Sequence, residues 1–223
     1  MIRAAFIIAL VLMAGCSGGQ DRPNFNLEVY NAVRNAAQPK AAAVERPPLT
    51  RAVLDTLEGS FTEAVLERFD QLAYLFVEAE RRDTSGRRII VWRSEDNVSV
   101  TLRNGVLVST HALGGDLIGA GIDQTGIGPA VGQHVRVMRF VDGGNRQVTM
   151  QFQCEVTDRG STTITIIERA HPTRHVVEDC SGDVGQIRNE YWIDTRAGLA
   201  WQSRQWAGPE VGYIRFRRLT HNQ

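Results

Sequence analysis

Residues 97–110, NVSVTLRNGVLVST, decide the fold class of this 223-residue chain. Apolar and polar residues alternate over positions 98–102, the pair Asn104 and Gly105 interrupts the pattern, and the alternation resumes over positions 106–108. Such alternation is typical of a strand with one buried face. Asn-Gly is favoured in two-residue hairpin turns because both central residues adopt positive φ. The stretch therefore predicts an antiparallel β-hairpin.

The same alternation recurs along the second half of the chain. It runs through VTMQFQCEV (148–156) and YIRFRR (213–218). Residues 133–141 and 146–157 both resemble strands, and the turn sequence DGGN between them predicts a second hairpin. Cys154 falls in phase with the apolar residues of its strand, so we expect it to be buried.

Residues 60–82, SFTEAVLERFDQLAYLFVEAERR, allow two interpretations. Their apolar residues recur at helical spacing, at Phe61, Val65, Phe69, Leu72 and Phe76. The segment LAYLFVEAE is nevertheless rich in aromatic and β-branched residues, and it leads into the strand-like RRIIVWRS. We predict two strands here, although the periodicity alone favours a helix.

A short helix is predicted before the strands. TRAVLDTL, residues 50–57, begins with Thr50 as a candidate N-cap and ends before Gly59. One helix followed by roughly ten strands predicts a mainly β fold, either an antiparallel β-barrel-like structure or a strongly bent sheet. We expect a single β domain over residues 49–223.

The N-terminal residues resemble a bacterial lipoprotein signal. Arg3 supplies a positive charge, residues 4–12 are apolar, and two small residues lead into Cys16. The apolar run is shorter than the roughly 20 residues of a membrane-spanning helix. We expect residues 1–15 to be a signal peptide and Cys16 to carry the lipid. The alternative is a plain signal peptide with an incidental cysteine.

The residues after Cys16 predict where the protein lies. Ser17 follows the cysteine, and in the sorting rule of enteric lipoproteins this favours the outer membrane, with the folded domain facing the periplasm. Residues 16–48 contain much Gly, Ala and Pro and resemble a lipid-anchored tether. Basic and acidic residues balance at 25 each, so no net charge favours nucleic acid as a partner. No motif predicts a cofactor.

Cys154 and Cys180 are the other two of the three cysteines. Thiols of exported proteins tend to pair, so we expect a disulfide between them. A metal pair or a catalytic thiol is the alternative, although no CxxC spacing favours either. The histidines show no metal-ligand spacing such as HExxH, so we predict no metal site and expect surface or capped histidines.

Two stretches carry a resemblance to a known family. Residues 91–121 contain a Trp-Arg-Ser strand beginning at Trp92, the Asn-Gly hairpin, and Thr110 followed by LGGDL. Residues 189–216 contain N-x-Y-W-x-D and G-x-x-W-x-S-x-Q, followed by Pro209. These features resemble the YjbF/GfcB family of lipoproteins, which are encoded with capsule and exopolysaccharide gene clusters.

The resemblance implies an outer-membrane lipoprotein with a β-barrel-like domain that assists polysaccharide assembly or export. Ala112 occupies a position where the family pattern leads us to expect a glycine. We expect a non-catalytic accessory factor that binds polysaccharide or a protein of the export machinery. A periplasmic polysaccharide-processing enzyme and a lipid or lipoprotein carrier are the alternatives.

Seven residues are candidate binding residues, namely Trp92, Thr110, Asp116, Trp192, Asp194, Trp201 and Gln205. Aromatic faces stack on sugar rings, and carboxylate or amide groups bond to sugar hydroxyls. Trp192 and Trp201 equally fit core packing. Asp116 and Asp194 would serve as the carboxylate pair if the protein were a glycosidase.

The glycines near Asp116 support two loop predictions. In LGGDL, Asp116 fits a turn that caps a short helix through Ile118. The Gly-rich residues 119–132 lack the lysine and the βαβ setting of a phosphate-binding loop, so we predict a mobile loop.

Overall fold

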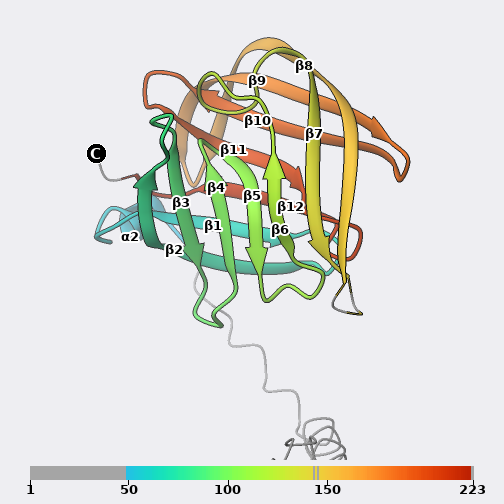
Figure 1. The fold of residues 1–223 in the computed structure, drawn as a ribbon. Helices are drawn as coiled ribbons and strands as arrows, with labels where there is room; N and C mark the ends of the chain where they lie inside the picture. The colour runs from blue at the N-terminus through green and yellow to red at the C-terminus, as the bar shows by residue number, and fades with distance from the viewer. Residues whose placement is uncertain (1–48, 143, 145, 222–223) are drawn as a thin grey trace, which may run out of the picture. The chain divides into compact units, whose positions relative to one another are not determined.

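The computed structural model describes residues 49–142, 144 and 146–221, and these form one antiparallel sheet of 12 strands (Figure 1). The strands are β1 Phe61–Leu66, β2 Gln71–Arg82, β3 Arg88–Arg93, β4 Ser99–Arg103, β5 Val106–His111, β6 Leu117–Gly121, β7 Gly132–Val141, β8 Gln147–Ile166, β9 Arg169–Gly182, β10 Gly185–Asp194, β11 Leu199–Trp206 and β12 Tyr213–Arg218. Within the residues described, one helix, α2 Arg51–Leu54, precedes them. The predicted signal peptide, tether and lipid-bearing Cys16 lie outside the described residues.

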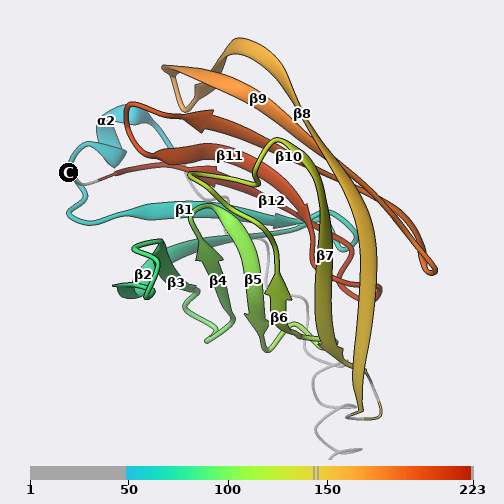
Figure 2. The ribbon, with the colours of Figure 1, turned by 45° about the horizontal axis from the view of Figure 1, so that its top comes forward.

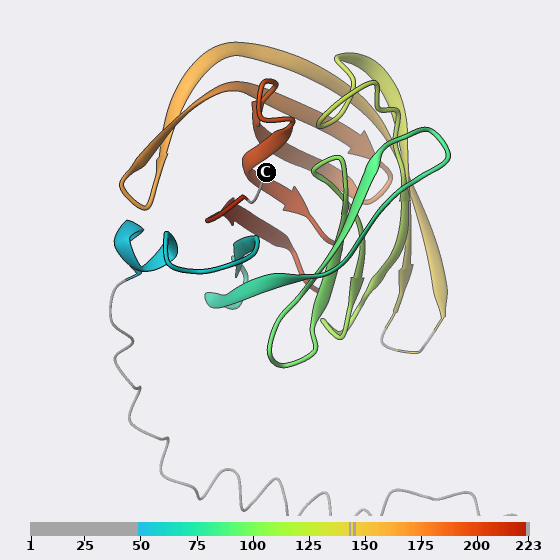
Figure 3. The ribbon, with the colours of Figure 1, turned by 90° about the vertical axis from the view of Figure 1, so that its left-hand side faces the viewer.

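The sheet curls into a nearly closed barrel (Figures 2 and 3). The strand order is β5-β4-β3-β2-β1-β12-β11-β10-β9-β8-β7-β6, so β1 pairs with β12 and joins the two ends of the described chain. The edge strands β5 and β6 lie side by side, without a backbone ladder between them in the described part of the chain. Closure protects strand edges that would otherwise pair with other chains. The predicted mainly β, barrel-like fold is confirmed.

The helix α2 is shorter than predicted. Thr50 is its N-cap, and the hydroxyl accepts a hydrogen bond from Val53 N at 3.3 Å. The helix ends at Leu54, which is buried against Ile166 of β8. A second helical turn would bury little additional apolar surface, since Leu57 is exposed.

Residues 61–82 form the two strands β1 and β2, and the helical alternative is wrong. The two strands pair as a hairpin in which Phe61 lies opposite Phe76 and Val65 lies opposite Leu72. Most of the apolar residues that suggested a helix therefore lie opposite one another in two strands. The spacing of three or four residues along the chain only resembles that of a helix.

Both predicted hairpins are present. Between β4 and β5, Asn104 and Gly105 have φ values of 45° and 83°, the two positive values of a type I′ turn. β7 pairs with β8, with Val141 opposite Gln147. β8 continues to Ile166, past its predicted end, because its second half pairs with β9.

The two loop predictions near Asp116 need correction. The residues after Asp116 form strand β6 and not a short helix, because they pair with β7, with Leu117 opposite Phe140. β6 also includes residues 119–121 of the stretch that was predicted to be a loop. Two of these three residues are glycines, so the alternation that reveals the other strands is not visible in the sequence.

Cys154 on β8 and Cys180 on β9 lie directly opposite each other and form a disulfide. Both cysteines are buried in the main core of the barrel, together with Phe152 and Trp206. The disulfide uses both thiols, so neither the metal pair nor the catalytic thiol is realised.

Candidate functional site

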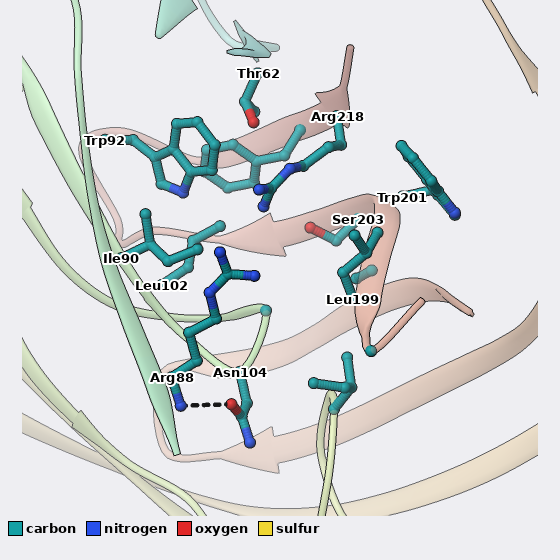
Figure 4. Close-up of a pocket in the computed structure, with 15 residues that line it drawn as sticks. Thr62, Arg88, Ile90, Trp92, Leu102, Asn104, Leu199, Trp201, Ser203 and Arg218 are labelled. Atoms are coloured by element: carbon teal, nitrogen blue, oxygen red, sulfur yellow. Dashed lines mark hydrogen bonds between the residues drawn. The ribbon is translucent and has the colours of Figure 1, made fainter. Parts of the chain in front are cut away.

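A recess of about 50 Å³ lies inside the barrel, at the end where β1 begins and β12 ends. Inward-facing residues of β1, β3, β4, β11 and β12 line it (Figure 4). Its walls are largely apolar and include Ile90, Leu102, Leu199 and Phe216. The recess has room for a few water-sized groups, because one water needs roughly 10–15 Å³ by this measure.

Trp92, one of the candidate residues, is fully buried in this recess. The guanidinium carbon of Arg218 lies 4.7 Å from the centroid of the Trp92 ring, which is a cation–π geometry. Trp92 Nε1 and Thr62 Oγ1 are buried, and the described residues provide no hydrogen-bond partner for either atom. Figure 4 shows the side chains of Thr62 and Arg218 extending into the recess beside Trp92.

Arg218 is only 7% exposed, and no carboxylate of the described residues forms a direct ion pair with it, although the more distant charge of Glu80 acts on it. Its Nε donates a hydrogen bond to Thr220 O at 3.2 Å, and one of its Nη atoms lies 3.4 Å from His221 Nδ1. Burial, followed by the charge of Arg88, lowers the pKa of Arg218 to about 10. The side chain therefore carries its positive charge at neutral pH inside a mostly apolar wall.

A wider groove of about 540 Å³ adjoins the recess. The two spaces share Arg88, Asn104, Ile127 and Gly198. The main-chain N of Arg88 donates to Asn104 Oδ1 at 2.8 Å, which is the dashed bond in Figure 4. The Arg88 side chain binds Glu80, with 2.7 Å between Nη2 and Oε2, and this hydrogen bond lowers the pKa of Glu80. The groove is therefore polar, and its carboxylate is already paired.

Arg218 and Thr62 were missed by the sequence analysis, although the alternation contains the signal. In YIRFRR, Arg218 falls in phase with Ile214 and Phe216, which face the interior. Thr62 falls in phase with Ala64 of β1 in the same way. An arginine at the buried phase of a strand is rare unless it is paired or functional.

Trp201 lines the recess, and its Nε1 donates to Asp194 Oδ2 at 3.3 Å. Its ring also lies 3.8 Å from the ring of His171, measured between centroids. Asp194 Oδ1 accepts hydrogen bonds from the main-chain N of Arg196 and of Ala197 at 2.9 and 3.0 Å. Partial burial acts to raise the pKa of Asp194, but these bonds outweigh it and lower the pKa. Asp194 is thus an ionised carboxylate that holds the turn after β10 and positions Trp201.

Trp192 lies on the outer face of the barrel, away from the recess. Its ring stacks on His175, with 4.7 Å between centroids and 9° between planes. His175 Nε2 is in turn 2.8 Å from Glu190 Oε2. The structure therefore does not bring Trp192 and Trp201 together as one aromatic platform.

Thr110 and Asp116 bridge the seam between β5 and β6. Thr110 Oγ1 donates to Asp116 Oδ1 at 2.9 Å and accepts from Leu117 N at 3.0 Å. Asp116 also accepts from the main-chain N of Ala112 and of Leu113, at 2.8 and 3.0 Å. Ala112 has a φ of 66°, which explains why a glycine is expected at this position. These residues take the place of the missing backbone ladder between β5 and β6.

Replacing Asp116 with alanine is expected to lower the free energy of unfolding by about 1–2 kcal/mol, because two main-chain N–H groups lose their acceptor. Urea denaturation of the protein in nonionic detergent measures the change. The matched control is Asp123→Ala, an exposed carboxylate a few residues away, which should change stability by less than about 0.5 kcal/mol. Equal effects of the two substitutions would contradict the bridging role of Asp116.

Gln205 is fully buried and contacts the edge strand β5 from inside the barrel. Its Oε1 accepts from Leu107 N at 2.8 Å and from the Tyr191 hydroxyl at 3.2 Å. Its Nε2 donates to Gly105 O and to Ser203 Oγ, both at 2.9 Å. Gln205 therefore binds the backbone of β5 at Leu107 and of the turn before β5 at Gly105.

A buried ion pair lies deeper in the barrel. Arg136 and Glu178 are both completely buried, with 3.0 Å between Arg136 Nη1 and Glu178 Oε2. Glu178 also accepts from Asn189 Nδ2 at 2.7 Å and from the Tyr191 hydroxyl at 3.2 Å, and it lies 3.0 Å from His134 Nε2. Burial acts to raise the pKa of Glu178, but the charge of Arg136 and the hydrogen bonds outweigh it and lower the pKa to about 2.

This cluster does not suit a metal ion. Potential ligand atoms of His134, Cys154 and Glu178 lie within 4.8 Å of one another. However, Cys154 is bound in the disulfide and offers no thiolate, and Glu178 is already paired with Arg136. His134 and His171 are buried and not on the surface, because both fall at the inward phase of their strands. Of the expected surface or capped histidines, His134 is a capped one, since Glu178 partners its ring nitrogen.

Asp116 and Asp194 lie at opposite ends of the barrel wall. The pairings from β6 through β9 place Asp116 at the end where β10 begins, at Gly185, whereas Asp194 lies where β10 ends. A glycosidase holds its two carboxyl groups on either side of one bond. The structure therefore does not assemble these two residues as such a pair.

Comparison with known proteins agrees with this architecture. The sequence matches the family described as "Group 4 capsule polysaccharide lipoprotein gfcB, YjbF" over residues 22–219. No curated protein matches it. Among solved structures, it resembles the crystal structure of the hypothetical lipoprotein YmcC from Escherichia coli (K12), with 18% identity and a TM-score of 0.67. The match covers 88% of this chain and 96% of that chain, and at this identity it shows a shared fold.

The family description agrees with a protein anchored to a membrane by lipid. Within the described residues, no helix has both the length and the apolar character needed to cross a membrane. The family match extends over most of the sequence, including β1 to β12 and both stretches that carry the resemblance. The chain belongs to the YjbF family of group 4 capsule polysaccharide lipoproteins.

Proposed function

We propose that this lipoprotein is a non-catalytic accessory factor in capsule or exopolysaccharide assembly or export. It is held by acylated Cys16 at the periplasmic face of the outer membrane and acts by binding the polymer. The family description, the lipoprotein signal and the all-β body support this proposal. The protein could instead bind a protein of the export machinery, and the experiments below distinguish this from binding of the polymer.

The observation that carries the proposal is the recess together with its adjoining groove. A small recess with an aromatic wall opens beside a groove of about 540 Å³ that is lined by polar groups. Such a combination is typical of a binding site, in which a few placed polar groups fix the orientation of the ligand. The groove has a volume of about 540 Å³, enough for sugar units, and its surface has the hydrogen-bonding groups that hydroxyls require.

The carboxylates at the site favour binding over hydrolysis. A general acid of a glycosidase needs a raised pKa so that it holds its proton. The hydrogen bond from Arg88 lowers the pKa of Glu80, and the pKa of Asp194 is lowered as well. Neither group is suited to protonate a leaving oxygen.

The lipid-carrier alternative is disfavoured by the size of the recess. An acyl chain needs a long apolar cavity, and the recess in the barrel has only about 50 Å³. Arg218 also places a positive charge within it.

Deletion of the gene is expected to lower the amount of surface or secreted polymer. Quantifying the polymer on the cell surface and in the culture medium measures this. A plasmid copy of the wild type should restore it, and so should folded Asp116→Asn and Asp194→Asn variants, because no carboxylate chemistry is needed. Unchanged polymer in the deletion strain would contradict the accessory role. Failure of both folded variants to restore the polymer would support an enzyme.

A further inference from the structure

The recess around Arg218 contains hydrogen-bond donors without partners. Trp92 Nε1–H can only donate, and the described residues offer it no acceptor. The hydroxyl of Thr62 is likewise buried without a partner in the described part of the chain. A buried polar group without a partner costs about 1–3 kcal/mol, so a structure that retains two in one recess needs an explanation.

Arg218 adds to these donors a positive charge that has no direct ion pair among the described residues, and only the more distant carboxylate of Glu80 acts on it. The neighbouring Arg217 faces the other side of the sheet and pairs with Glu63, with 2.7 Å between Nη2 and Oε1. Arg136 pairs with Glu178 in the barrel interior. Arg218, in contrast, has only the Thr220 carbonyl and His221 as polar partners among the described residues, together with the face of Trp92. A buried cation with unpartnered donors beside it is complementary to an anion.

The surroundings favour a singly charged anion. Arg88, which lies at the junction of recess and groove, already binds Glu80. Arg82 is exposed, lines the groove and not the recess, and donates to the Gly86 carbonyl at 2.8 Å without an ion pair among the described residues. Of the two cations that line the recess, Arg88 and Arg218, only Arg218 lacks a direct ion pair within the described residues. A carboxylate, planar and singly charged, matches the fork of one guanidinium group, whereas a doubly charged phosphate would call for a second free cation within the recess itself.

The volumes of the recess and of the groove indicate that a ligand would occupy both spaces, with a different part of the ligand in each. The recess of about 50 Å³ accommodates a carboxylate but not a sugar ring. The adjoining groove of about 540 Å³ has room for the ring and shares Arg88 and Asn104 with the recess. A sugar whose carboxylate projects from its ring fits both spaces at once.

We propose that the recess binds the carboxylate of an acidic sugar, with Arg218, Trp92 Nε1 and the Thr62 hydroxyl as its donors and with the sugar ring in the groove. This inference rests on the proposed polymer-binding function and names the class of polymer, one that contains hexuronate or similar carboxylated residues. The apolar walls exclude water around the ion pair, which strengthens the interaction. Trp92 then has a binding role through its indole N–H, while its ring packs in the core.

Calorimetric titration of the mature protein in nonionic detergent tests this assignment. The probes are an oligogalacturonate and the neutral, carboxyl-reduced oligosaccharide of the same length. Wild type is expected to bind the acidic oligosaccharide at least about tenfold more tightly, and Arg218→Met should remove that preference, since a hydrogen bond to a charged group contributes about a factor of ten or more. Arg215→Met, on the exposed face of the same strand, is the matched control and should bind as wild type does.

Thr62→Val keeps the test decisive if Arg218→Met fails to fold. The substitution removes a buried hydroxyl that has no partner in the described structure, so folding should be unaffected or slightly favoured. Affinity for oligogalacturonate should nevertheless fall by about threefold to tenfold. The indole N–H signal of Trp92, assigned with Trp92→Phe, should shift in the NMR spectrum on binding the acidic oligosaccharide and not the neutral one.

Three results would overturn the assignment. The first is equal binding of the acidic and neutral oligosaccharides, which would leave the proposed polymer-binding function intact. The second is wild-type affinity in both Arg218→Met and Thr62→Val. The third is tighter binding of a tripeptide through its C-terminal carboxylate, which would indicate a protein partner. If neither oligosaccharide binds, and the polymer from the cell does not bind either, the inference and the proposed function both fail.

Discussion

Glu178→Gln is expected to lower the free energy of unfolding by about 3–5 kcal/mol, one of the two largest effects that we predict. The substitution preserves the size of the side chain but leaves the Arg136 guanidinium completely buried without a counter-charge. Breaking a buried ion pair from one side is costly for this reason. Urea denaturation of the protein in nonionic detergent measures the loss.

The same pair predicts an acid-dependent loss of stability. The pKa of Glu178 is lowered from 4.5 to about 2 in the folded protein, so the unfolded chain binds the proton more readily. The stabilisation is therefore fully present above about pH 4.5 and is lost as the pH falls towards 2, by an amount on the order of 3 kcal/mol. Glu178→Gln should lack this part of the acid dependence.

Two controls separate the buried pair from an ordinary surface interaction. Asp179→Asn removes the next carboxylate along β9, whose ion pair with Arg188 is exposed, and should cost less than about 1 kcal/mol. The double variant Glu178→Gln with Arg136→Met should recover part of the loss, because it removes both charges. A loss below 1 kcal/mol in Glu178→Gln would contradict the importance of the pair.

Loss of the disulfide is the second large predicted effect. Cys154 and Cys180 are 26 residues apart, and closing a loop of this length stabilises the folded state by roughly 3.5 kcal/mol in the chain-entropy model. The double variant Cys154→Ala with Cys180→Ala should therefore lose about that amount, with a further contribution from the space left in the core. Urea denaturation under nonreducing conditions measures the difference.

The control for the disulfide lies on the same strand. Thr163→Ala alters an exposed residue of β8, beyond the disulfide, and should change stability by less than about 0.5 kcal/mol. Wild type in the presence of a reductant should approach the stability of the double alanine variant. A double alanine variant as stable as wild type would show that the bond does not hold β8 to β9 in any energetically important way.

Much of the fold could be predicted because its signals are local. The Asn104–Gly105 turn is specified by two residues, and the strands on either side alternate clearly. β6 could not be recognised, because its glycines have no side chains to show which face is buried. The length of α2 depends on what Leu54 meets in the folded barrel, which the helix itself does not encode.

The site was predictable only in part, because its chemistry depends on long-range register. Trp92 and Trp201 were identified as candidates, and the structure brings both to the recess. Asp116 was singled out for its sugar-binding potential, whereas its contacts belong to the seam. The alternation in YIRFRR places Arg218 on the buried face, but its lack of a direct ion pair is visible only once β12 is placed against β1.

The most direct test of the account measures what the protein does to the polymer. Mature protein is mixed with polymer purified from the same cells, and size-exclusion chromatography follows both co-elution and polymer length. We predict that protein elutes with the polymer and that the length distribution stays unchanged after long incubation. Shortened polymer, or protein that elutes alone at every polymer concentration, would contradict the claim that this lipoprotein acts by binding polysaccharide.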